Sequence, residues 1–258
     1  MQLTSETAAR AVAVLVVESS VYFAAAWRGL FRRLPIFTTY LLTVLTCDVF
    51  RFGVSFSLGQ ASRQYFVVYW GTQVILMGLR AAVVYELCRE LLKPYTGVMK
   101  LCWLILVSAG LALVAFALIV NINHGPYVAR IILTIDRGIE LGVLGVLVLA
   151  MWFCRYYQIP APRLIGLIGL GLSLYSAINI LSNTLADHWF RAFQPIWTEV
   201  RGDSFILAEL VWLIAVWKPL PLPRPSPSLL DYQEYSAMTS SVNVRLRELN
   251  SWLEEVLR

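Results

Sequence analysis

The stretch VARIILTIDRGIELGVLGVLVLAMWFC, residues 128–154, decides the class of fold to which this chain belongs. A membrane-spanning helix needs about 20 consecutive, mostly apolar residues, and this stretch exceeds that length. In lipid, a helix also satisfies its backbone hydrogen bonds within its own segment. Three ionisable side chains nevertheless interrupt the middle of the stretch: Asp136, Arg137 and Glu140. The sequence therefore predicts a transmembrane helix that carries charges where hydrocarbon would surround it.

The composition of the whole chain is typical of the same class. Of its 258 residues, 59% are hydrophobic and 14% are charged, and the mean hydropathy is +0.67. Soluble domains average about 25% charged residues. The apolar runs extend over Ala11–Trp27, Ile36–Phe56, Tyr65–Leu87, Met99–Ile122, Val128–Cys154, Leu164–Leu185 and Phe205–Trp217. We predict an all-α fold, a polytopic membrane helix bundle with seven transmembrane helices.

The distribution of basic residues between the runs predicts the topology, because cytoplasmic loops carry an excess of Lys and Arg. The odd-numbered loops contain Arg28, Arg32, Arg33, Arg89, Lys93, Lys100, Arg155 and Arg163. The even-numbered loops contain fewer basic residues, and the longest of them is expected over 187–203. We therefore place the N-terminus outside and the C-terminus in the cytoplasm. The membrane is expected to be the bacterial inner (plasma) membrane.

Three parts follow one another along the chain. Residues 1–219 form the bundle, residues 220–237 form a Pro-rich cytoplasmic linker that cannot continue a helix, and residues 238–258 form a cytoplasmic amphipathic helix. Its apolar positions are Val242, Leu246, Leu249, Leu253 and Val256. This helix could lie on the inner membrane face, pair with a second copy in a homo-oligomer, or dock on a cytoplasmic partner. Besides these partners we expect contact with the lipid bilayer and none with nucleic acid.

Charged residues recur at comparable depth in several of the predicted helices. They are Glu18, Asp48, Arg51, Asp136, Arg137, Glu140 and Glu209. Each ionised group near the bilayer centre costs about 2.5 to 3.5 kcal/mol on insertion scales, so these groups must be paired, hydrated or neutral. We expect them to converge on one sheltered interior site that binds a small ligand or a cation.

Local pairing accounts for only some of these charges. Asp48 with Arg51, and Arg137 with Glu140, are spaced three residues apart and can pair along their own helices. Glu18, Asp136 and Glu209 have no basic partner of this kind.

Other polar residues lie near the predicted site along the sequence. Arg80 is expected nearer the cytoplasm, where it reaches the inner interface or pairs with Glu86. The sixth run carries Ser173, Tyr175, Ser176, Asn179 and Asn183 at helical spacing, which could line the same site or bond neighbouring helices.

Catalytic and cofactor motifs are missing from the sequence. It contains no H-E-x-x-H, no G-x-S-x-G and no phosphate-binding glycine loop. At the depth where microbial rhodopsins hold retinal on a lysine, the last run has Glu209. We therefore expect no enzyme, no cofactor and no bound metal.

Two functions fit these observations. The first is a non-enzymatic membrane protein, a sensor or a scaffold, with a polar intramembrane site for a small ligand or cation. The second is a proton-coupled or cation transporter that uses Glu18, Asp136, Glu140 and Glu209. The absence of a visible internal repeat speaks against the second.

Overall fold

The computed structural model describes residues 5–59, 62–92, 128–156, 161–188, 194–217 and 232–256, together with single positions between 97 and 119. Its elements are the helices α1 (Ser5–Trp27), η1 (Leu30–Arg32), α2 (Pro35–Leu58), α3 (Arg63–Leu91), α5 (Val128–Tyr156), α6 (Arg163–His188), α7 (Gln194–Trp217) and α8 (Tyr232–Val256). No strand occurs within these ranges. The prediction of an all-helical protein is confirmed for this part of the chain.

Four helical segments are long and apolar enough to cross a membrane. They are Pro35–Leu58, Arg63–Leu91, Thr134–Tyr156 and Arg163–Ser182, and a shorter apolar segment covers Ala11–Trp27. Their length and composition indicate a membrane protein. The fourth predicted run, Met99–Ile122, falls largely outside the described residues.

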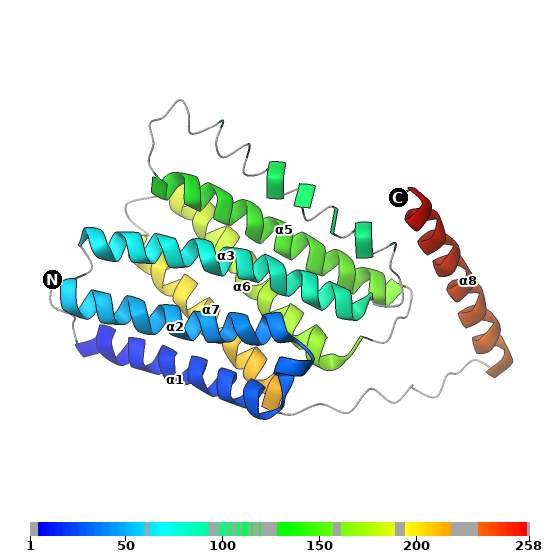
Figure 1. The fold of residues 1–258 in the computed structure, drawn as a ribbon, viewed down its shortest axis with the longest axis horizontal. Helices are drawn as coiled ribbons and strands as arrows, with labels where there is room; N and C mark the ends of the chain where they lie inside the picture. The colour runs from blue at the N-terminus through cyan, green and yellow to red at the C-terminus, as the bar shows by residue number, and fades with distance from the viewer. Residues whose placement is uncertain are drawn as a thin grey trace.

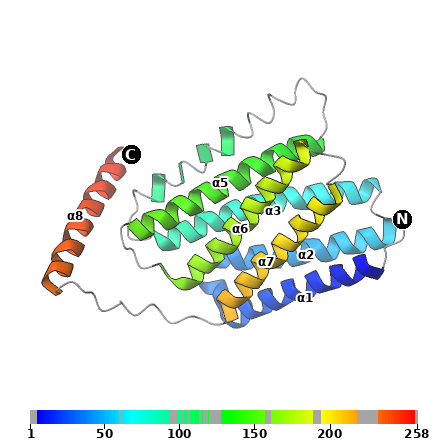
Figure 2. The same ribbon diagram turned by 180° about the vertical axis from the view of Figure 1, so that it is seen from behind.

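The helices of the bundle form a closed ring. Following the chain, α1 contacts α2, α2 contacts α3, α3 contacts α5, α5 contacts α6, and α6 contacts α7, which returns to α1. A further contact joins α3 to α6 across the ring. In Figure 1, α1, α2, α3 and α5 lie in front, and Figure 2 shows α6 and α7 from the opposite side. Side chains from helices distant in sequence therefore meet inside this ring.

Alternate connections lie at the same end of the bundle. The α1–α2 connection and the C-terminal ends of α3, α5 and α7 share one end (Figure 1). At this end Arg28 donates a hydrogen bond to the carbonyl oxygen of Trp217. Glu86 of α3 accepts hydrogen bonds from the backbone N–H groups of Ile36 and Phe37, at 2.9 and 2.7 Å. These bonds satisfy donors that the first turn of α2 would otherwise leave unpaired.

The last helix of the bundle begins earlier than the hydropathy pattern predicts. We expected an outside loop over 187–203, but α6 runs to His188 and α7 starts at Gln194. Pro195 lies in the first turn of α7, where a missing N–H costs no helical bond. With 24 residues, α7 is about 36 Å long. The hydrocarbon core of a bilayer is about 30 Å thick, and the predicted apolar run alone is shorter than that.

An aromatic core holds α7 against α2 and α6. Trp212 is fully buried and packs edge-to-face against Phe37, Tyr40 and Phe205, with ring centroids 5.6 to 6.2 Å apart. Its indole N–H donates to the carbonyl oxygen of Ile168, at 3.1 Å. Burying an indole requires such a partner for its donor. The register of α7 against α6 is therefore set by both packing and a hydrogen bond.

The amphipathic helix α8 contacts the chain segment that follows α3. The backbone N–H of Gly97 donates to the side-chain oxygen of Asn250, at 2.6 Å. Leu253 is 6% exposed and belongs to the hydrophobic core, with Leu249 and Met99 packed against that core. The apolar stripe of α8 thus docks on its own chain, a contact that we had not predicted from the sequence.

Substituting valine for Gly97 is expected to release α8. A Cβ at this position would lie 2.9 Å from the Cβ of Leu253 and 3.1 Å from Asn250 Oδ1, which is closer than van der Waals contact allows. We expect amide exchange in α8 to become faster by on the order of tenfold, measured by hydrogen–deuterium exchange with mass spectrometry. Gly110→Val is the control, because its added Cβ meets no atom of the described chain within 4 Å. Equal exchange in the wild type and the Gly97 variant would contradict the docking.

Candidate functional site

Five polar side chains meet between α3, α5 and α6, and we call them the ion cluster: Arg80, Asp136, Glu140, Ser176 and Asn179. Arg80 forms an ion pair with Glu140 and lies 3.7 Å from Asp136 Oδ1. The Ser176 hydroxyl donates to Glu140 at 2.5 Å. The Asn179 amide donates to Glu140 at 3.3 Å and to Asp136 at 3.5 Å.

The ion cluster is sealed inside the protein. None of its side chains belongs to a residue that is more than 3% exposed. The Arg80 guanidinium also lies over the ring of Tyr175, 5.3 Å from its centroid. A buried charge is tolerated only with good geometry and further hydrogen bonds. Here one cation faces two carboxyl groups, and neutral side chains of α6 donate hydrogen bonds to carboxyl oxygens.

Three carboxyl groups from α1, α2 and α7 form a second group, the acidic cluster: Glu18, Asp48 and Glu209. Glu18 and Glu209 are 2% and 1% exposed. Asp48 is the less buried member, with a side chain that is 27% exposed. The three carboxyl groups lie within electrostatic range of one another. Within the described chain, neither Glu18 oxygen accepts a bond from a donor, and neither does Glu209 Oε2. Because like charges repel strongly where the dielectric constant is low, a proton or a cation would stabilise this cluster.

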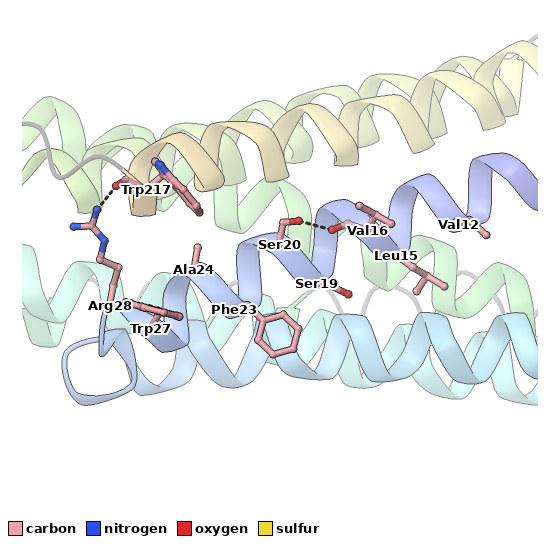
Figure 3. Close-up of a pocket in the computed structure, with 10 residues that line it drawn as sticks. All are labelled: Val12, Leu15, Val16, Ser19, Ser20, Phe23, Ala24, Trp27, Arg28 and Trp217. Atoms are coloured by element: carbon pink, nitrogen blue, oxygen red, sulfur yellow. Dashed lines mark hydrogen bonds between the residues drawn. The ribbon is translucent and has the colours of Figure 1, made fainter.

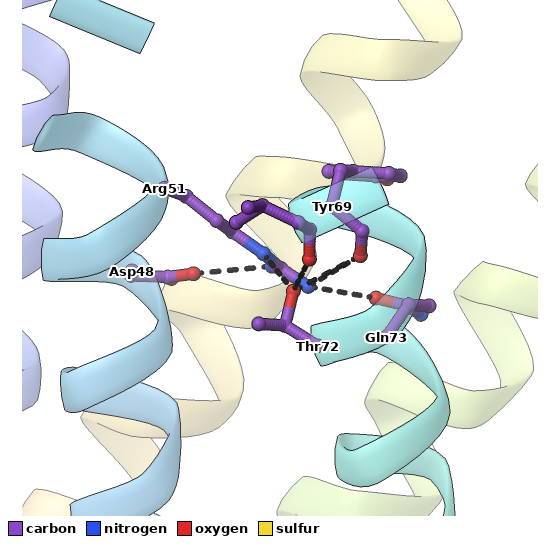
Figure 4. A network of polar contacts seen from close by, with 6 residues as sticks. Asp48, Arg51, Tyr69, Thr72 and Gln73 are labelled. Carbon is purple, nitrogen blue, oxygen red and sulfur yellow. Dashed lines mark hydrogen bonds and ion pairs between the residues drawn. The ribbon is translucent and has the colours of Figure 1, made fainter. Parts of the chain in front are cut away.

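Arg51 connects the acidic cluster to α3 (Figure 4). Its guanidinium lies 3.1 Å from Asp48 and donates to the Thr72 hydroxyl at 2.7 Å. Further bonds of 3.4 Å reach the Tyr69 carbonyl and the Gln73 side chain, and the Tyr69 ring lies 4.9 Å away. This arginine therefore shares its charge between Asp48 and several neutral acceptors. It does not neutralise three carboxylates.

Tyr40 of α2 has electrostatic neighbours in both clusters. It is 1% exposed. Arg80 and Tyr175 are its electrostatic neighbours from the ion cluster side, and Glu209 and Asp48 are those from the acidic cluster side. A hydroxyl can both donate and accept a hydrogen bond. The Tyr40 hydroxyl is therefore a polar group that could interact with either cluster.

The structure divides the predicted site residues between two places. Glu18, Asp48, Arg51 and Glu209 lie in or beside the acidic cluster, and Asp136 and Glu140 lie in the ion cluster. Arg137 is half-buried on the adjoining face of α5. The predicted pair of Asp48 and Arg51 is confirmed at 3.1 Å. The prediction was one shared site; the ion pairs within the described chain join Arg80 to Asp136 and Glu140, and Arg51 to Asp48.

The predicted surroundings of Arg80 were wrong. It neither reaches the interface nor pairs with Glu86, whose oxygens accept the backbone N–H groups at the start of α2. Arg80 is 3% exposed and turns inward to Asp136 and Glu140. Spacing along one helix had suggested Arg137 as the partner of Glu140, but Arg80 comes from a different helix. Residue spacing along one helix does not predict a partner on a different helix.

Sequence reasoning recovered some of the neutral residues of the site and missed others. Tyr175, Ser176 and Asn179 were expected from their helical spacing, and all three lie at the ion cluster. Tyr40 and Gln73 were missed. The sequence feature that could have indicated them is a polar side chain inside an apolar run. For Tyr40 this feature is weak, because tyrosine is common in membrane helices.

Comparison with known proteins gives no assignment. No model of a protein family matches this chain, and no curated protein and no solved structure matches it. We therefore infer the function from the chemistry of the ion cluster and the acidic cluster.

Proposed function

We propose that this chain is a non-enzymatic membrane protein that binds a proton, or a small cation in its place, at the acidic cluster. The supporting observation is the burial of Glu18 and Glu209 beside Asp48, with no donor to either Glu18 oxygen or to Glu209 Oε2 within the described chain. Neighbouring like charges repel strongly where the dielectric constant is low, so a bound positive charge would stabilise the arrangement. A sensor or a scaffold is the role that fits best, because binding would alter the packing of helices and requires no chemical reaction.

The proposed membrane arrangement has seven spans, with the N-terminus outside and the C-terminal helix in the cytoplasm of a bacterial cell. It is supported by the basic residues of the first connection, Arg28, Arg32 and Arg33, which lie at the same end of the bundle as the C-terminal ends of α3, α5 and α7 (Figure 1). An excess of positive charge at one end is typical of the cytoplasmic side.

The acidic cluster joins three helices that contact one another in series. α1 contacts both α2 and α7, and each of the three contributes one carboxyl group. Loss of the bound positive charge would make these carboxylates repel, which favours a looser packing of α1. A ligand shifts a conformational equilibrium by its difference in affinity for the two states. The acidic cluster would couple cation binding to the position of α1 in this way.

Labelling with dicyclohexylcarbodiimide tests the proposed site, because this apolar reagent modifies protonated carboxyl groups within membranes. We expect modification of Glu18 or Glu209 in the reconstituted protein, mapped by peptide mass spectrometry, and its loss in Glu18→Gln and Glu209→Gln. Glu255 provides an internal control, since it is exposed on α8 and should stay unmodified. Protection by added Na⁺ at constant pH would identify a metal cation as the competitor. Absence of label from both glutamates would refute the proposal.

Proton-coupled or cation transport is a second candidate, favoured by Tyr40, a buried hydroxyl with electrostatic neighbours in both clusters. Transport requires a route between them, whereas binding does not. In liposomes that contain a pH-sensitive dye, flux that disappears in Tyr40→Phe, Glu140→Gln and Glu209→Gln would favour transport. Carbodiimide labelling without any flux would favour the sensor or scaffold.

A further inference from the structure

A long groove lies between α1 and α7 on the outer surface of the bundle. Its volume is about 880 Å³. Val12 and Val16 of α1 line one end, and Trp27, Arg28 and Trp217 line the other (Figure 3). At about 1.5 Å per residue, the wall from Val12 to Arg28 is roughly 24 Å long. One leaflet of hydrocarbon is about 15 Å thick, so the groove is long enough for an acyl chain.

The groove faces the surroundings of the protein and not its interior. Its apolar wall residues Val16 and Phe23 are 59% and 66% exposed. A smaller hollow continues it past Ser20 to Ile214 on α7. The segment Ala11–Trp27 that forms its floor is apolar. In a membrane, this surface meets lipid chains.

A cationic group stands at one end of the groove. Arg28 lies there, held by its hydrogen bond to the carbonyl oxygen of Trp217. Arg32 and Arg33 follow in the same connection and are exposed. Among the described residues that line the groove, none is acidic. Arginine pairs well with phosphate oxygens, and tryptophan is typical of the level of the lipid headgroups.

We propose that the groove between α1 and α7 binds an anionic phospholipid, with an acyl chain along Val16 and Phe23 and the phosphate at Arg28. The charge at one end and the apolar length behind it match the two parts of such a molecule. This inference does not depend on the acidic cluster, because none of its three carboxyl groups lines the groove.

Native mass spectrometry of the whole protein, released from nanodiscs of phosphatidylcholine and phosphatidylglycerol, tests the inference. We expect the wild type to retain phosphatidylglycerol in preference to phosphatidylcholine. In Arg28→Gln the retention of phosphatidylglycerol should fall about fivefold, the effect of one arginine near an anionic surface. Arg63→Gln is the matched control, an exposed arginine at the opposite end of the bundle, and it should retain lipid as the wild type does.

A second variant tests the apolar part of the groove. Val16→Trp places a bulky side chain in the groove at an exposed position, where folding should tolerate it. We expect it to reduce retention of both phospholipids. Unchanged retention in Arg28→Gln and Val16→Trp would overturn the proposal, as would an equal loss in Arg63→Gln, which would indicate only a general attraction to basic surface. A dimer that Val16→Trp dissociates would show instead that a second copy occupies the groove.

Discussion

Replacing Arg80 by leucine is expected to destabilise the fold by about 3–5 kcal/mol, the cost of removing one partner from a buried ion pair. The reason is the environment of Asp136 and Glu140, which are 0% and 1% exposed and face this guanidinium. Without it, Ser176 and Asn179 supply the remaining donors. Neutral donors cannot replace a cation beside two carboxylates. The measurement is the free energy of unfolding in mixed micelles as sodium dodecyl sulfate is increased.

A compensating variant separates loss of charge from loss of packing. In the combination of Arg80→Leu with Asp136→Asn and Glu140→Gln, no charge remains in the ion cluster, so most of the lost stability should return. The amides keep the approximate size of the carboxyl groups. A single Arg80→Leu variant as stable as the wild type would contradict the ion cluster, and failure of the compensating variant to recover would assign the loss to packing.

Replacing Gly171 by alanine is expected to cost about 1–3 kcal/mol by overpacking. A Cβ at this position on α6 would lie 2.9 Å from Cδ1 of Trp212, closer still to its Nε1, and 3.2 Å from the carbonyl oxygen of Ala208. The indole cannot retreat easily, because Trp212 is fully buried and bonded to Ile168. Thermal unfolding followed by tryptophan fluorescence in detergent measures the effect.

Gly169→Ala is the matched control on the same helix. Its added Cβ would meet only Cδ2 of Leu147, at 3.8 Å, which is an ordinary van der Waals contact. Alanine is a better helix former than glycine by about 0.8–1.0 kcal/mol in water, so this variant should be as stable as the wild type or more stable. If both alanine variants behave alike, the close approach of α6 to Trp212 is wrong.

Some contacts followed directly from the sequence. Asp48 and Arg51 are three residues apart on α2, and helical geometry brings such a pair together wherever the helix lies. Ser176 and Asn179 share a face of α6 for the same reason. Predictions of this kind succeed because a single helix has a fixed rise and a fixed turn per residue.

Other contacts depend on how whole helices are placed. Arg80 and Glu140 belong to α3 and α5, and nothing in the local spacing of either run selects one as the partner of the other. The start of α7 at Gln194 and the docking of Asn250 on Gly97 are similar cases. Hydropathy predicted a loop over 187–203 and gave no contact for the C-terminal helix. The reason is that hydropathy reports affinity for lipid and not the contacts that a polar helix makes with protein.

The sequence by itself determined that this chain is helical and suited to a membrane, and that its buried charges require partners. Both conclusions come from local properties, since apolar length and the cost of an unpaired charge do not depend on the neighbours of a helix. Only the tertiary structure decided the partners. Arg80 pairs with Asp136 and Glu140, whereas Glu18, Asp48 and Glu209 lie near one another. Several pairings of these charges are equally compatible with the sequence. The order of the helices around the ring, and the rotation of each about its axis, determine which pairs form.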